Sequence, residues 1–159
     1  MTSIGLDRSG QVSTRADHRR ISFTSLTSPT DFNVNLVETI RSCTEVYLTH
    51  WNMRDVPVDG SGLPATRTAV LHIEGIHDKG VNYINGNYTS GTMLYMNNGG
   101  ANPYRDVPAD EQLIAMYDSP QTVGRLRFRI TDENGANLAG GVSAFTCSLI
   151  FVIHPDERK

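Results

Sequence analysis

The sequence predicts an all-β domain, either a sandwich or a small barrel, and three observations support this class. Apolar and polar residues alternate along several short segments from Asp31 onward. Gly, Asn and Pro gather between these segments, as is typical of turns and loops. The chain also holds 27 Ser and Thr residues and 11 Asn residues among its 159. Because these residue types are poor in helix interiors, a helical domain is disfavoured.

The predicted strands follow one another with turn signals between them. The period of two marks five strands, at 32–36, 46–48, 71–73, 125–130 and 145–153. Asn134-Gly135 follows the fourth strand and predicts a tight turn. In the stretch 108–117 a helix that begins at Pro108 competes with a strand over Leu113–Tyr117, and both stay open.

The length of 159 residues predicts one domain, which we divide into three parts. Residues 1–30 are a polar arm rich in Ser, Thr and Arg, residues 31–155 are the β domain, and residues 156–159 are a short charged tail. A segment of the arm's composition cannot build its own core. It either lies on neighbouring subunits or folds back on its own domain. We expect the β domain to fold without residues 1–30 and to assemble less well.

Four residues of the arm are candidate assembly contacts. They are Arg15, Arg19, Arg20 and Phe23. The three arginines form a small basic cluster with His18, although Asp17 dilutes its charge. A solvated charge run is the competing interpretation.

Charge and cysteine content exclude several classes of function. The formal net charge of −3 lacks the excess of basic residues of a nucleic-acid-binding domain, so we expect no direct contact with nucleic acid. Two cysteines, Cys43 and Cys147, cannot form a disulfide framework, and we expect both to be small buried residues. No apolar run approaches the 18 residues of a membrane span, and no signal peptide is evident.

Catalytic motifs are missing from the sequence. There is no phosphate-binding loop and no nucleophile elbow. His72 and His77 are the closest histidine pair, but their odd spacing does not place them on one face of a strand. We therefore expect no enzyme, cofactor, metal ion or small-molecule substrate. An enzyme on a cupin-like barrel with a metal held by distant residues is an alternative.

Two strand surfaces are further candidates for assembly contacts. Arg125, Arg127 and Arg129 occupy every second position of one strand, so all three project from one face. They face either a partner or an anion, or they are solvated and paired with acids on adjacent strands. In the last strand Ile150 and Val152 make the second face apolar as well. Such a strand is either central in a sandwich or covered by a partner.

Aromatic residues in loops support a second class of function. Trp51, Tyr88 and Tyr104 are candidate loop contacts, to which Tyr83 can be added. If these rings are exposed together, they suit a β-sandwich module that binds a receptor or a carbohydrate.

Several segments resemble a known group of structural proteins. They are Phe32-Asn-Val-Asn-Leu36, Val46-Tyr-Leu48, Arg54-Asp-Val-Pro57, Val81 to Thr89, Gly124 to Gly135 and Phe145 to Ile153. Together these strand and turn patterns resemble the single jelly-roll capsid proteins, penton or minor, of large icosahedral double-stranded DNA viruses. The resemblance covers most of residues 15–153.

The resemblance implies a single jelly-roll β-sandwich of about eight antiparallel strands with an extended N-terminal arm. It implies a capsid building block that assembles with copies of itself, a pentamer among the expected forms, and with other capsid proteins. It also implies that the protein is located in the virion and is made in the host cell cytoplasm.

Overall fold

The structure is a computed structural model, and its strands come from the alternating segments of the sequence. It describes residues 4–6, 12–14, 17–27, 29–58, 68–76, 81–84, 87–96, 100–106, 112–138 and 142–154. The strands are β1 (Ile4–Leu6), β2 (Val12–Thr14), β3 (Asp17–Ser25), β4 (Asp31–Arg54), β5 (Thr68–Glu74), β6 (Val81–Ile84), β7 (Asn87–Ser90), β8 (Thr92–Tyr95), β9 (Tyr104–Asp106), β10 (Gln112–Thr131) and β11 (Ala144–Ile153). The described residues contain no helix, so the all-β prediction is confirmed. Accordingly, no helix long and apolar enough to cross a membrane occurs in this part of the chain.

Seven strands form one antiparallel sheet in the order β3-β11-β4-β10-β5-β8, with β9 paired to β4. Two short pairs, β1 with β2 and β6 with β7, are separate from this sheet. The last strand, β11, pairs with β3 along nine residues on one side and with β4 on the other. The predicted strand at 145–153 is therefore central in its sheet.

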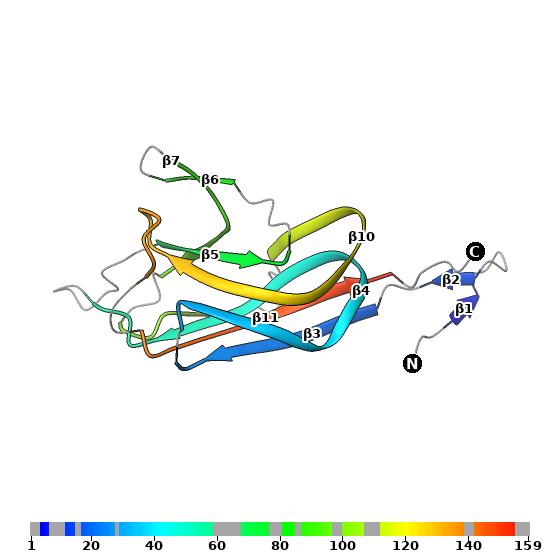
Figure 1. The fold of residues 1–159 in the computed structure, drawn as a ribbon, viewed down its shortest axis with the longest axis horizontal. Helices are drawn as coiled ribbons and strands as arrows, with labels where there is room; N and C mark the ends of the chain where they lie inside the picture. Colours follow the sequence, from blue (N-terminus) through cyan, green and yellow to red (C-terminus); the bar gives the residue numbers. More distant parts are fainter. Residues whose placement is uncertain are drawn as a thin grey trace.

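Strands β4 and β10 are long, and Figure 1 shows both turning back at the same end of the molecule. Residues 31–35 of β4 pair with residues 125–129 of β10, whereas residues 43–48 of β4 pair with residues 112–121 of β10. In β4 the bend contains Ser42, whose φ of 55° is unusual for a residue with a side chain. Each strand is thus divided into two halves that lie in different parts of the sheet.

The halves create two facing rows of strands with the core between them. The first row is β3, β11, the second half of β4 and the first half of β10. The second row is the first half of β4, the second half of β10, β5 and β8.

Aromatic rings join the two rows across the core. The ring of Phe128 lies 5.0 Å from that of Phe23 in the first row and 4.8 Å from that of Phe32 in its own row. Phe32 in turn reaches Phe145 of the first row at 6.3 Å. Large apolar side chains of both rows complete this core, because positions of one parity along each strand face inward.

The boundary that the sequence suggested between arm and domain is wrong for residues 17–25. These residues form β3, and Phe23 is buried in the core at 4% exposure. The period of two is present there, since Arg19, Ile21 and Phe23 are less exposed than the residues between them. Polar residues at the alternate positions give this strand the composition of an arm. Within 108–117 the described residues from Gln112 onward belong to β10, so the strand alternative is correct for them.

Candidate assembly surfaces

The arginine stripe of β10 lies on the outer face of the second row, as its spacing predicts. Leu126, Phe128 and Ile130 point into the core and are fully buried. Arg125, Arg127 and Arg129 alternate with these residues along the strand. Arg125 is exposed, whereas Arg127 and Arg129 are half-buried. We keep the name arginine stripe for these three residues.

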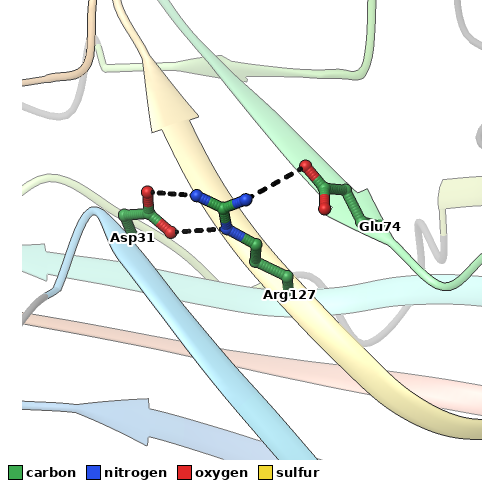
Figure 2. Close-up of polar contacts among 3 residues, drawn as sticks. All are labelled: Asp31, Glu74 and Arg127. Carbon is green, nitrogen blue, oxygen red and sulfur yellow. Dashed lines mark hydrogen bonds and ion pairs between the residues drawn. The ribbon is translucent and has the colours of Figure 1, made fainter.

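Arg127 is held by acids of its own chain, and Figure 2 shows it between Asp31 and Glu74. Its Nε donates to Asp31 Oδ1 at 2.9 Å and its second terminal nitrogen donates to Asp31 Oδ2 at 2.8 Å. Glu74 of β5 lies on the other side, with 3.8 Å between the charged atoms. Acids on neighbouring strands thus pair with Arg127 within the same chain. The alternative in which the stripe is solvated and paired with adjacent acids predicted this for all three arginines.

This bidentate contact shifts the ionisation of both partners. Hydrogen bonding from Arg127, more than its charge alone, holds the pKa of Asp31 below its ordinary value. The same bond raises the pKa of Arg127. Arg129 lies opposite Asp31 in the register, and its charge also contributes to lowering the pKa of that carboxyl group.

The other two arginines differ from Arg127. Arg125 borders a polar groove of about 450 Å³, whose other lining residues are Asn33, Glu74, Gly75 and Arg127. Arg129 has its Nε buried without a hydrogen-bond partner among the described residues. The stripe is therefore fixed at its centre, while Arg125 at one end is available to a partner.

Ile150 and Val152 lie on the outer face of β11, opposite to the core. They are 7% and 5% exposed, although neither belongs to the core cluster. Ile150 lies in register between Arg20 and Tyr47, whose long side chains flank it. Because so little of the two side chains is accessible, the direct contact role expected for them does not suit their placement.

Exposed apolar residues next to this face were missed in the sequence. Leu113 and Met116 of β10 are 45% and 46% exposed. In the register Leu113 lies opposite Tyr47, which lies opposite Ile150, so the three cross one face of three strands. A bulge between Leu113 and Ala115 breaks the alternation there, and period counting cannot detect such a shift.

The four candidate assembly contacts predicted within residues 1–30 do not share one environment. Phe23 is buried in the core and is not available to a partner. Arg19 forms an ion pair with Glu38 of β4 at 2.9 Å, and Arg20 is exposed. Arg15 lies outside the described residues.

Of the aromatic residues proposed for ligand stacking, the structure describes the side chains of Trp51 and Tyr104, and only Tyr104 is exposed. Trp51 lies near the end of β4 with 1% exposure, so it is a core residue and not a loop contact. Tyr104 is exposed at 54%. The side chain of Tyr88 lies outside the described part, although its backbone belongs to β7. Because Trp51 is buried, the largest aromatic ring predicted for a receptor- or carbohydrate-binding surface is not accessible to a ligand.

No group of three or more His, Cys, Asp or Glu residues in the described part of the chain is suited to hold a metal ion. Both cysteines are free and buried, as the sequence predicts. Burial raises the pKa of the Cys43 thiol to about 11 and raises that of Cys147 as well, which keeps both in the unreactive neutral form.

Comparison with known proteins gives remote structural likenesses. No protein-family model matches the chain, and no curated protein matches it. A chain of infectious bursal disease virus, Gx strain, aligns with a TM-score of 0.35 and 16% identity over 99% of this chain and 37% of its own length. A crystal structure of the VP2 subviral particle of that virus aligns with a TM-score of 0.35 and 16% identity, over 97% of this chain and 37% of its own length. This chain spans little more than a third of those chains. These likenesses are too remote to indicate a fold or a function for this chain.

Proposed function

We propose that the chain is a capsid building block with a single jelly-roll fold, acting as a penton or minor capsid protein of an icosahedral double-stranded DNA virus. The order of the strand halves is the observation that carries this proposal. When β4 and β10 are each counted as two, eight segments make two rows of four. Along the chain each segment crosses to the other row, except between β5 and β8. Two facing four-stranded sheets connected in this way are typical of a jelly roll.

The segments that carry the resemblance to viral jelly-roll proteins support the same proposal. The motif at Phe32–Leu36 lies in the first half of β4, and that at Val46–Leu48 lies in its second half. The motifs at 124–135 and 145–153 cover the end of β10 with its turn, and β11. In that turn Gly135 has a positive φ of 82°, and Asp132 Oδ1 accepts hydrogen bonds from the backbone amides of Asn134 and Ala136.

The proposal includes the partners and the location of the protein. Copies of this chain, in a pentamer or beside other capsid proteins, meet through the exposed end of the arginine stripe, through Arg20 and through the arm. The protein is located in the virion after synthesis in the host cytoplasm. It acts by occupying a position in a shell and not by catalysing a reaction.

Light scattering on a size-exclusion column tests this function. We expect the purified chain to form a closed ring, with five copies for a penton, because repeated heterologous contacts close into rings. A chain that stays monomeric at every concentration, both alone and with the other virion proteins, would contradict the proposal. An Arg125→Glu variant should shift the ring toward monomers. Arg41→Glu is a matched change on β4 outside the stripe and should leave the ring intact.

A further inference from the structure

A groove runs between β3 and the first half of β4, where the two rows meet at one side of the sandwich. Five consecutive residues of each strand line it, 19–23 and 34–38, around a volume of about 390 Å³. Ile21, Val34 and Leu36 pack against the core from here and remain half-buried. The groove is therefore an incompletely covered margin of the core, bridged by the Arg19–Glu38 ion pair.

Both strands that border the groove are sheet edges. Among the described residues β3 pairs only with β11, and the first half of β4 pairs only with β10. Val37 on this edge of β4 is fully exposed. Open edges of this length readily accept an added strand. The apolar lining adds a requirement, since the added strand must present apolar side chains on one side.

Residues 1–16 are the part of the arm that precedes β3, and from here on the name arm is kept for them alone. They contain a segment of the required kind. Their strands β1 and β2 have three residues each and pair only with each other in the described structure. Such a small hairpin is barely stable in water, so it needs a further partner. Ile4 and Leu6 are two apart in the sequence, and an extended segment presents such residues to one side.

The arm is better placed to reach a second copy than its own groove. It precedes β3 directly, and neither of its strands pairs with β3 or β4 of the same chain. Figure 1 shows β1 and β2 beyond the end of the sheet at which β3 begins. Sixteen extended residues reach roughly 50 Å, enough to cross onto a neighbouring domain.

We propose that the groove between β3 and the first half of β4 binds the arm of a second copy, with Ile4 and Leu6 facing its apolar lining. This inference rests on the proposed assembly function and adds the site through which the arm acts. The bound segment would cover both sheet edges and complete the burial of Ile21, Val34 and Leu36.

Disulfide trapping between two differently tagged full-length chains tests the proposal. One chain carries Leu6→Cys and the other carries Val37→Cys, and the mixture is oxidised with oxidised glutathione. Only residues brought to within ordinary disulfide distance form the bond. The native cysteines are buried and contribute little background. Val58→Cys is the matched control, because Val58 is also exposed but does not line the groove.

We expect the mixed dimer to form several-fold faster with Val37→Cys than with Val58→Cys. Equal rates for the two variants would overturn the proposal. So would a doubly substituted Leu6→Cys/Val37→Cys chain that closes on itself at high dilution, because the arm would then occupy its own groove. Light scattering of the same samples separates the two hypotheses. A ring without trapping at Val37 overturns only the groove, whereas trapping without any ring or shell overturns only the capsid function.

Discussion

Phe128 is the residue at which the two rows of strands make their closest aromatic contact. It is fully buried, and its ring meets one phenylalanine from each row. Aromatic pairs at such distances add to the free energy gained by burying the rings. Stability of the sandwich is therefore concentrated at this position.

Replacing Phe128 by Ala should destabilise the fold strongly. We expect the free energy of unfolding to fall by about 3–5 kcal/mol, the usual cost of a large cavity in a core. Urea unfolding followed by fluorescence measures the change. Val58→Ala is the control on an exposed valine and should alter stability by no more than about 0.5 kcal/mol. A loss below about 1 kcal/mol for Phe128→Ala would contradict the packing described here.

Asp31 and Arg127 predict a dependence of stability on acid pH. The pKa of Asp31 is lowered in the folded state, so the carboxylate contributes stability above the unfolded value of 3.8. That contribution is lost as the pH falls through the folded-state pKa. We expect Asp31→Asn to have a lower Tm than the unchanged chain at pH 7, with the difference narrowing below pH 3.8. Asp118→Asn, on an exposed residue of β10, is the control and should have the same Tm as the unchanged chain at pH 7.

At the scale of strands, the bends of β4 and β10 decide how the sheet becomes two rows. Ser42 has a positive φ, and its carbonyl accepts a hydrogen bond from the amide of His154 at 3.1 Å. At the bend the register between β4 and β10 shifts, between Gln121 and Val123 of β10. The corner is thus a specific backbone feature.

Substitutions at Ser42 should separate backbone strain from side-chain effects. Valine is strongly disfavoured at positive φ, and we expect Ser42→Val to destabilise the fold by more than about 1 kcal/mol. Glycine adopts this conformation freely, so Ser42→Gly should be clearly more stable than Ser42→Val. Thermal unfolding of both variants measures the difference. Equal stabilities would mean that the bend does not depend on the conformation of this residue.

Strands with a regular alternation of apolar and polar residues could be predicted from the sequence. The sequence predicted the bent strands only as separate short segments. The segments at 32–36 and 46–48 are correct but are two halves of one strand. The residues between them include Glu38, Thr39 and Arg41, which interrupt the apolar pattern where the backbone turns. The strand β3 was missed because exposed polar residues fill one of its faces.

The candidate surfaces could be predicted only in part, because exposure depends on neighbouring strands. The common face of the arginine stripe follows from spacing alone. The acids that hold Arg127 come from β4 and β5, and no local pattern identifies them. Trp51 shows the same limit, since its burial depends on β9 and β11 on either side of it.

At the scale of the whole molecule, the domain begins at β3 and not at Asp31. Deleting residues 1–30 removes a whole edge strand together with Phe23, so we expect that truncation to unfold or aggregate. Deleting residues 1–16 leaves the seven-stranded sheet intact and should preserve cooperative unfolding. Circular dichroism with thermal unfolding compares the two. A cooperative transition in the longer deletion would mean that β11 does not need β3.

The pairing of β11 also sets a condition on the time course of folding. Its neighbours β3 and β4 are made more than 85 residues earlier and cannot pair with it until it leaves the ribosome. During that interval their apolar faces lack the central strand of the row. Pairing between such distant segments is slow, and exposed strand edges favour aggregation meanwhile. The nascent chain is therefore most in need of a chaperone just before its last strand is synthesised.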